Sequence, residues 1–455
     1  MELERGHPLV ILDGGDSLGK EVRGKTEAGL GQRRAKARLI AEEWVASGLD
    51  AAALGEMDWN LGTPFVLETT KRAGYPVVAA NLVCEGGKRP FPAARVFEHG
   101  DRKVGVVGVT AGEVDGCAVT DPAEAAVAAR ALLPEDVDVT VLLWPDRFEK
   151  ANFGAREGLD FDFLLDASGR AGKDLPQRAG STWMLGGGMK TKSVSIVTVE
   201  LGDGKGYFPD GYRESLEDDR KRLQRRIDDA REVLAKGKGK KEMLERQIAG
   251  QTVQVEEVEQ QLQAFLQGGH NRMEVRSITL DEDIPNHAPT FERVEAVKAT
   301  FSELDDATGA EVISRPMRIE HGPYVGTEGC ISCHPTQYNQ WRSTGHARAI
   351  SVLVAVDRHR DEDCFSCHVT GAAPAGIAGY PVTIADSTSV GGGNNVQCEA
   401  CHGPGRDHAA DPTKHHPVKT PPETLCRACH TPEQDEGRFD FAQYLPKVAH
   451  PDPAE

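Results

Sequence analysis

Four C-x-x-C-H motifs stand in the last third of the chain: CISCH at 330–334, CFSCH at 364–368, CEACH at 398–402 and CRACH at 426–430. They hold eight of the ten cysteines. Two thiols three positions apart can reach the two vinyl groups of one porphyrin, and the adjacent imidazole can then reach the iron. This spacing is the attachment signature of c-type haem, so we expect four covalently bound haem c groups.

Each motif supplies two thioether cysteines and one proximal iron ligand. The eight cysteines are Cys330, Cys333, Cys364, Cys367, Cys398, Cys401, Cys426 and Cys429. The four proximal ligands are His334, His368, His402 and His430. Zinc also binds paired C-x-x-C units, but it does not need a histidine after every pair. A disulfide within a pair would close almost no loop, so haem is favoured.

The second axial ligands are expected to be histidines. The last methionine is Met317, so no thioether sulfur is available from residue 318 onward. Seven histidines in this part lie outside the motifs: His321, His346, His359, His408, His415, His416 and His450. Ligation by methionine and histidine raises the potential of a haem, so its absence predicts low potentials.

Residues 321–455 are rich in Gly, Pro, Asp and His and have few long apolar runs. Such a segment buries too little side-chain surface to fold alone, and four porphyrins would supply the missing apolar interior. We therefore expect short helices at the motifs joined by loops, in a mainly α and loop multihaem domain.

The flanks of the motifs carry a family resemblance. The runs YVGTEGCISCHPTQYNQWRSTGHARA, CFSCHVTG, VQCEACHGPGRDH and CRACHTPE, with FDFAQYLPKVAH, resemble the tetrahaem cytochromes whose best-known member accepts electrons from hydroxylamine oxidoreductase. The resemblance implies that the distal ligands are His346, His408 and His450. It also implies a five-coordinate haem at His368, whose open position could bind a small molecule. The weaker distal candidates are His321, His359, His415 and His416.

The first two hundred residues alternate short apolar runs with amphipathic stretches, which predicts an α/β domain with packed sheets. Helices are expected at 33–47 and 63–74. Strands are expected at 8–16, 50–55, 75–82, 103–110, 137–144, 161–168 and 193–201.

The order LDGGDSLG, ALGEMDWNLG, YPVVAANL and KVGVVGVT resembles the metallophosphoesterase domain of nucleotidases over about residues 8–201. Those enzymes hold two metals that clamp the attacking and leaving oxygens of a phosphoryl transfer. Here Asp16 and Glu56 alone remain as residual ligands. Met57 and Asp58 follow Glu56 where the family has Asn-His-Glu.

Other ligand positions of that family are also replaced in this chain. Its lone histidine falls near Trp144 and Pro145, and Ser168 and Arg170 stand where imidazoles belong. Met and Arg do not bind hard metals, so we expect a catalytically silent, pseudoenzyme-like sandwich. Cys84 and Cys117 could form a disulfide in an oxidising compartment or remain two buried thiols.

Between these parts, the composition at 212–266 shifts to Glu, Lys, Arg, Gln and Leu. Apolar residues recur at steps of three, four and seven, and KGKGK at 236–240 interrupts them. This pattern predicts an antiparallel coiled-coil hairpin that either serves docking or dimerisation or is a spacer packed on itself. The expected domains are 1–205, the hairpin 206–270, a helical linker 271–320 and the haem domain 321–455.

The chain has 71 acidic and 53 basic residues, a formal charge of −18, which disfavours nucleic acid as a partner. No run reaches the roughly 18 apolar residues of a membrane span. No signal peptide is visible in this sequence. Since this type of haem attachment is completed outside the cytoplasm, we expect a periplasmic or extracellular protein.

Three functions follow from the sequence. The leading hypothesis is a non-enzymatic electron carrier with redox protein partners, other multihaem cytochromes among them. The second is a haem-dependent oxidoreductase acting on a small nitrogen or sulfur compound at the five-coordinate haem. The third is a metal-dependent phosphoesterase fused to a cytochrome.

Overall fold

The structure, a computed structural model, describes seventeen segments of the chain. They are residues 9–20, 30–145, 159–167, 177–179, 181–186, 193–202, 206–209, 211–237, 240–267, 271–281, 283–301, 324–356, 358–359, 361–365, 367–370, 394–431 and 438–450.

The chain divides into two compact units. The first comprises Met1–Ser17 and Trp44–Pro285, and the second Leu18–Glu43 and Asn286–Glu455. The expected borders at residues 205 and 270 fall inside the first unit and the border at 320 inside the second, so the four-domain division remains a prediction.

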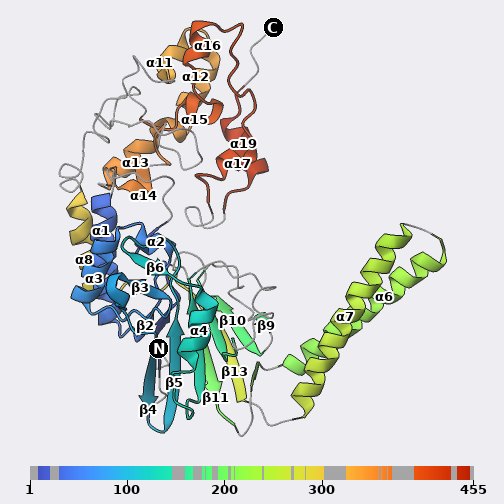
Figure 1. Ribbon diagram of the computed structural model, residues 1–455. Helices are drawn as coiled ribbons and strands as arrows, with labels where there is room; N and C mark the ends of the chain where they lie inside the picture. The colour runs from blue at the N-terminus through green and yellow to red at the C-terminus, as the bar shows by residue number, and fades with distance from the viewer. Residues whose placement is uncertain are drawn as a thin grey trace. The chain divides into compact units, whose positions relative to one another are not determined.

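The first unit is an α/β structure that also carries two long helices (Figure 1). Its strands are β1 (Leu12–Asp13), β2 (Ala51–Ala52), β3 (Leu82–Cys84), β4 (Ala94–His99), β5 (Arg102–Gly108), β6 (Cys117–Val119), β7 (Val139–Trp144), β8 (Phe163–Asp166), β9 (Gln177–Ala179), β10 (Thr182–Gly186), β11 (Ser193–Glu200), β12 (Tyr207–Pro209) and β13 (Asn271–Thr279). Its helices are α2 (Glu56–Trp59), α3 (Thr63–Ala73), η2 (Glu85–Gly87), α4 (Pro122–Arg130), α6 (Tyr212–Ala235) and α7 (Lys241–Leu266).

The largest sheet has six strands in the order β4-β5-β7-β8-β10-β9. Strands β5, β7, β8 and β10 are parallel, and β4 and β9 pair antiparallel at the two edges. A second sheet has the order β11-β13-β12, and two small sheets pair β1 with β2 and β3 with β6.

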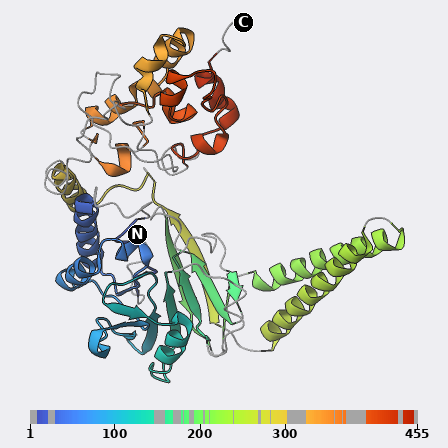
Figure 2. The same cartoon turned by 45° about the horizontal axis from the view of Figure 1, so that its top comes forward.

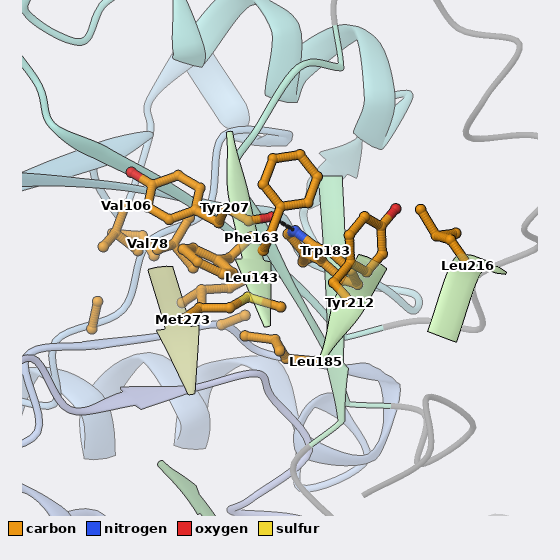
Figure 3. Close-up of a cluster of buried hydrophobic side chains, with 14 of the residues drawn as sticks. Val78, Val106, Leu143, Phe163, Trp183, Leu185, Tyr207, Tyr212, Leu216 and Met273 are labelled. Carbon is orange, nitrogen blue, oxygen red and sulfur yellow. Dashed lines mark hydrogen bonds between the residues drawn. The ribbon is translucent and has the colours of Figure 1, made fainter. Parts of the chain in front are cut away.

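Alternate residues of the six-stranded sheet enter two different cores, because successive strand side chains point to opposite faces. One set joins residues of the three-stranded sheet in a first cluster (Figure 3): Val106, Leu143, Phe163, Trp183, Tyr207 and Met273. The intervening set packs with the alanines of α4 in a second cluster: Val107, Leu142, Leu164, Met184, Ala123, Ala126 and Ala129. The predicted α/β character of this part is therefore confirmed.

The strand expected at 75–82 is wrong for most of its length. Only Leu82 belongs to a strand, although Val77, Val78 and Ala79 are buried. The amide of Val78 donates to the carbonyl of Ala52 at 2.9 Å, and that of Ala80 to Gly108 at 2.7 Å. Because successive amides bond to different segments, no continuous ladder forms. A buried, extended segment has the same apolar sequence pattern as a strand. Only its hydrogen-bond partners decide whether it belongs to a sheet.

Helices α6 and α7 lie side by side (Figures 1 and 2). The side chains that face inward include Leu216, Leu223 and Ile227 on α6, with Leu244 and Leu262 on α7, all at most 9% exposed. The turn between them contains Gly237 with φ of 65°, in the left-handed region that glycine adopts without strain. Tyr212, Leu216 and Leu262 also join the first apolar cluster, which fixes the base of the helix pair to the sheets.

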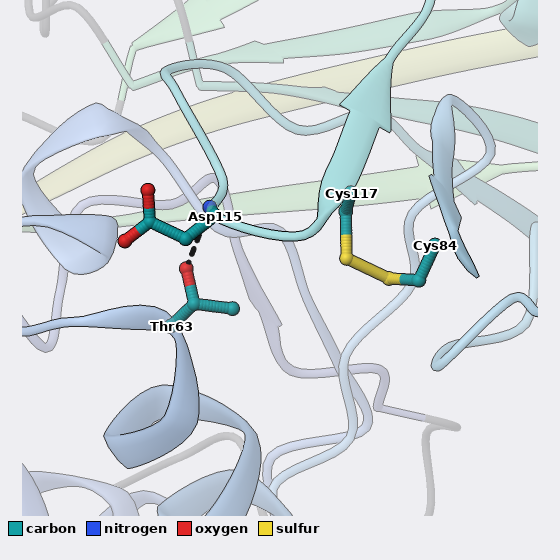
Figure 4. The surroundings of a disulfide bond; sticks show 4 residues. All are labelled: Thr63, Cys84, Asp115 and Cys117. Carbon is teal, nitrogen blue, oxygen red and sulfur yellow. Dashed lines mark hydrogen bonds between the residues drawn. A yellow bond between two sulfur atoms is a disulfide. The ribbon is translucent and has the colours of Figure 1, made fainter.

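Cys84 and Cys117 form a disulfide between β3 and β6, so of the two alternatives for these thiols the structure has the bridged one (Figure 4). Beside it, the amide of Asp115 donates to the hydroxyl of Thr63 at 3.0 Å.

The second unit is helical in its described part, as expected. Its helices are α8 (Ala288–Ala299), α11 (Gly326–Ile331), α12 (Pro335–Arg342), η3 (His346–Arg348), α13 (Ala349–Ala355), α14 (Glu362–Phe365), α15 (Cys398–His402), α16 (Arg406–Ala410), α17 (Glu423–Cys426) and α19 (Phe441–Val448). Helix α1 (Leu30–Ala46) begins in this unit and ends in the first. None of the helices in the described ranges combines the length and apolar character that crossing a bilayer requires.

Candidate functional site

The C-x-x-C-H motifs lie on short helical turns. In the first motif the amide of His334 donates to the carbonyl of Cys330 at 2.9 Å, and in the fourth that of His430 donates to Cys426 at 2.9 Å. The third motif forms helix α15. A hydrogen bond from residue i to residue i−4 closes one helical turn and puts both side chains on the same face. One cysteine and the histidine of a motif therefore face the same side.

None of the eight motif cysteines, which all lie in the described ranges, takes part in a disulfide. Within the described ranges, no group of three or more His, Cys, Asp or Glu side chains is arranged to hold a metal ion.

Three motif imidazoles each face an imidazole from outside the motifs. The ring-centre distances are 6.2 Å for His334 and His408, 6.1 Å for His430 and His346, and 5.6 Å for His402 and His450. Each pair joins a predicted proximal ligand to one of the three distal candidates that the family resemblance names.

These distances fit two imidazoles that share one metal ion. An imidazole nitrogen binds a transition metal at about 2 Å and the ring centre lies roughly 1 Å further out, so two such rings on opposite sides of one ion have centres about 6 Å apart. The donor set therefore fits haem iron.

Hydrogen bonds orient several of these rings. The Nδ1 of His402 lies 2.6 Å from the carbonyl oxygen of Val418, and that of His408 lies 2.7 Å from that of His415. When Nδ1–H donates to a carbonyl, Nε2 carries the lone pair that a metal needs. Burial, followed by the nearby His430, lowers the pKa of His346, which favours the neutral, ligating form.

The imidazole of His368 differs from the other three. Its Nδ1 lies 2.6 Å from the carbonyl oxygen of Ala349. Among the described residues no second imidazole faces it, and the adjacent Val369 packs against Ile350 and Leu353. Of the weaker distal candidates, His359 is partly buried, His415 and His416 are exposed, and His321 lies outside the described residues.

Thiols from different motifs also meet. A hydrogen bond joins the side chains of Cys330 and Cys398; it raises the pKa of Cys330 and lowers that of Cys398 to about 7. Another joins Cys429 to Cys367 and raises the pKa of Cys429. The structure thus brings the first motif to the third and the second to the fourth.

Two buried polar residues, which the sequence patterns did not indicate, connect the first motif to the third. The carboxylate of Glu399, 2% exposed, accepts hydrogen bonds from the amides of Val325 at 2.9 Å, Gly326 at 2.7 Å and Gly405 at 2.7 Å. Gln397 accepts from the amide and the hydroxyl of Thr327, both at 2.8 Å. Glu399 is a variable position of its C-x-x-C motif, so the motif pattern gives no signal for it.

In the first unit, Asp16 forms hydrogen bonds with two residues of helix α2. Its Oδ1 accepts from the amide of Met57 at 2.8 Å, and its own amide donates to Asp58 at 3.0 Å. Burial raises the pKa of Asp16 to about 6, with the charges of Glu56 and Asp13 as smaller causes. Glu56 itself is exposed.

The other replaced positions of the phosphatase pattern have separate locations. Trp144 and Pro145 line an open pocket of about 310 Å³ together with Thr110 and Gly112. Ser168 and Arg170 lie outside the described residues. Asp16 and Asp58, which both lie in the described ranges, accept hydrogen bonds from backbone amides: Asp16 from Met57, and Asp58 from Asp16 and Gly55.

Comparisons with known proteins concern the two halves of the chain separately. Residues 329–403 match the family described as cytochrome c554 and c-prime, which implies that this part of the chain binds haem covalently. The match contains the first three motifs, and the fourth lies beyond its end. No curated protein matches the chain significantly.

Solved structures are similar to about two fifths of the chain. They include sulfate thiohydrolase SoxB of Thermus thermophilus (24% identity, TM-score 0.36, 42% of this chain and 36% of that one). They also include a 5'-nucleotidase precursor from the same organism (19%, 0.34, 42% and 42%). A third is the calcineurin-like phosphoesterase YfkN from Bacillus subtilis (18%, 0.34, 43% and 72%). The chain spans less than half of the first two proteins.

Proposed function

We propose that this chain is a tetrahaem c-type cytochrome that transfers electrons outside the cytoplasm. The observation that carries the proposal is the set of three imidazole pairs, each joining a motif histidine to a histidine from elsewhere at 5.6 to 6.2 Å. Such pairs are of no evident use to a haem-free fold, whereas they suit six-coordinate iron.

In this proposal His334 and His408, His402 and His450, and His430 and His346 are the axial ligands of three haems. His368 is the proximal ligand of the fourth. The bound haems supply reversible one-electron oxidation of iron. The chain holds the porphyrins through eight cysteines, and carbonyls such as that of Val418 fix ring orientation and tautomer.

The contacts between thiols support a continuous route for electrons. Porphyrins attached at Cys330 and Cys398 would be neighbours, as would those at Cys367 and Cys429. Cys401 and Cys426 lie close enough to interact electrostatically, which would link the third haem to the fourth. We infer the order first, third, fourth, second.

The phosphatase-like domain has a different proposed role. The carboxylate of Asp16 serves backbone amides, so we propose that the domain does not hydrolyse phosphoesters and acts in docking or assembly. Helices α6 and α7, as a coiled-coil hairpin, are a candidate for binding a redox partner or a second copy. The disulfide of Cys84 and Cys117 supports an exported protein, since disulfides persist in oxidising compartments.

The direct test counts haems and their spin states. The pyridine haemochrome and the intact mass are expected to give four haems per chain, and electron paramagnetic resonance three low-spin and one high-spin ferric centre. His408→Ala is expected to convert one further centre to high spin. His415→Ala is the matched control: it removes a nearby exposed imidazole and keeps the backbone carbonyl that His408 uses. A colourless protein, or equal spectra for the two variants, would contradict the proposal.

One observation favours a second function, a haem-dependent oxidoreductase for a small nitrogen or sulfur compound. In the described ranges His368 faces no imidazole, which leaves a coordination position for a ligand. If the enzyme reading is right, hydroxylamine, nitrite or sulfite will bind to the high-spin centre and be turned over with a redox dye. Binding without turnover would contradict the oxidoreductase function and leave electron transfer as the proposed function. The third candidate, a phosphoesterase fused to a cytochrome, would hydrolyse a generic phosphoester in the presence of manganese or zinc. We do not expect this hydrolysis.

A further inference from the structure

An N-terminal segment far from the motifs in sequence belongs to the same compact unit as the haem-binding region. Residues Leu18–Glu43 lie in the second unit, with Asn286–Glu455. The segment contains most of α1, which is not part of any cytochrome motif. Its charged residues meet the chain just before the second C-x-x-C-H motif.

The contact is made by lysines and aspartates. The Nζ of Lys36 lies 2.8 Å from Oδ1 of Asp361 and 2.6 Å from Oδ2 of Asp363. Lys20 forms a further ion pair with Asp363. The side chain of Asp361 is 7% exposed and that of Lys36 24% exposed, so bulk solvent screens this interaction weakly. Lys36 also lies over the ring of Phe301, 4.8 Å from its centre.

A second set of ion pairs holds the chain just before Asp361. Arg358 lies 2.5 Å from Glu295 of helix α8. Helix α8 in turn holds α1, because Arg293 lies 2.5 Å from Glu42 and also pairs with Glu43. Helices α1 and α8 thus form a charged clamp on Arg358, Asp361 and Asp363.

The clamped residues lead directly into the attachment site. Asp363 immediately precedes Cys364, and the amide of Cys364 donates to the carbonyl of Asp361 at 2.9 Å. These charges also reach the thiol of Cys364. Burial is the largest cause raising its pKa, followed by Asp361 and Asp363, while Lys36 and Arg358 lower it.

We propose that Lys36 is a positioning residue for the second haem: it holds the Asp361–Cys364 segment in place and sets the reduction potential of that haem. The inference rests on the proposed function, since it assumes a porphyrin on Cys364 and Cys367. It assigns the N-terminal segment a role at the haem of His368, which faces no second imidazole in the described part of the chain. The physical basis is charge balance near a group that gains one positive charge on oxidation.

The sign of the effect follows from that balance. Lys36 offsets Asp361 and Asp363. Without Lys36, Asp361 loses this cation and Asp363 keeps Lys20, so the local charge becomes more negative. A more negative surrounding stabilises the ferric, more positive state, and the potential of this haem falls. Neutralising Asp361 has the opposite effect. A clamp that merely stabilised the fold would change the melting temperature and leave the potentials unchanged.

The test is a redox titration of the full-length holoprotein, with the high-spin and low-spin centres followed separately. Lys36→Met is expected to lower the potential of the high-spin haem and leave the three low-spin haems in place as internal controls. Asp361→Asn is expected to raise it, the double variant to return it near the wild-type value, and Lys36→Arg to preserve it. Lys20→Met removes a partner of Asp363 that is more exposed than Lys36, and it should have a smaller effect.

Two results would overturn the inference: an unchanged high-spin potential in Asp361→Asn and Lys36→Met, or an equal shift of all four haems. If Lys36→Met does not fold, Asp361→Asn and Lys36→Arg still decide the question. Failure of the proposed function is recognised separately, because wild-type protein would then lack haem or a high-spin centre.

Discussion

The interiors of the two units are built from different materials. In the α/β part, two large clusters of apolar side chains fill both faces of the six-stranded sheet. In the described part of the haem-binding region, the apolar cluster consists of Ile350, Leu353 and Val369, with Val354 and Cys364 packed beside it. Its other buried residues are largely polar, such as Gln397 and Glu399.

The difference indicates which parts of the chain fold by themselves. Apolar burial stabilises by about 25 cal/mol per Å², and the α/β part has that surface in its own side chains. In its described part, the haem-binding region buries little apolar surface and fixes its backbone instead by hydrogen bonds to buried polar side chains such as Glu399 and Gln397. We therefore expect the α/β part to fold without cofactor and the haem-binding region to depend on porphyrin.

The largest expected effect comes from withholding haem. Protein made without haem attachment is expected to lose all protection from hydrogen exchange in residues 324–450 and to keep it in the six-stranded sheet, because the missing porphyrins are the interior of one region only. Hydrogen exchange measured by mass spectrometry checks this. Equal protection of residues 324–450 in the apo and holo proteins would break the comparison.

Next in size is Glu399→Ala. The change leaves three amide donors, those of Val325, Gly326 and Gly405, without their acceptor, at a cost on the order of 3 kcal/mol or more. Thermal unfolding followed at the haem absorption band should show a much lower midpoint. The control is Glu423→Ala, which removes a carboxylate paired at the surface with Arg427 and should change the midpoint little.

The corresponding change in the α/β part is Leu143→Ala. Leu143 has an exposure of 0%, and truncation of a buried leucine costs about 2–5 kcal/mol. Chemical denaturation followed by tryptophan fluorescence measures the loss, while haem spectra and potentials are expected to stay unchanged. Leu132→Ala, at a side chain 74% exposed, is the control. Altered haem potentials in Leu143→Ala would mean that the two interiors are coupled.

Asp16→Asn probes the residual phosphatase position through pH. Because the folded pKa of about 6 exceeds the ordinary 3.8, the wild-type carboxyl disfavours the folded state increasingly as pH rises through this interval. Asparagine keeps the oxygen acceptor and tolerates the φ of 59° at this position. The variant should therefore gain up to about 2–3 kcal/mol over wild type at pH 7, about 0.5 kcal/mol at pH 4 and almost nothing near pH 3, with chelator present.

A variant that is less stable than wild type at pH 7 would mean that the charged carboxylate is required. Its natural explanation would be a bound metal ion. Wild-type protein would then also be stabilised by added manganese or zinc. This result would contradict the proposal that the domain does not hydrolyse phosphoesters.

The smallest effect is expected on the exposed face of helix α6. Arg213 and Glu217 form an exposed pair 2.9 Å apart on α6, and such pairs contribute about 0.3–0.5 kcal/mol. Arg213→Ala should therefore change the unfolding midpoint very little. The midpoint is measured at low and at high salt. A large loss of stability or of self-association in this variant would reveal a partner on the hairpin.

Much of the organisation could be predicted from residues close together in sequence. The C-x-x-C-H motifs are complete within five positions, so their chemistry needs no tertiary information. Apolar periodicity likewise predicted the helices at α1 and α3 and the strands β5 and β7. The same reasoning failed at 75–82, where Val78 and Ala80 bond to different segments.

The sequence by itself determined the kind of cofactor chemistry and the set of histidines available for it. Only the tertiary structure decided which imidazoles face each other, that Glu399 binds three amides of other segments, and that Lys36 meets Asp361. Apart from that between Glu399 and Gly405, these contacts join residues tens to hundreds of positions apart. They depend on how loops close around one another, and no local propensity or spacing contains that information.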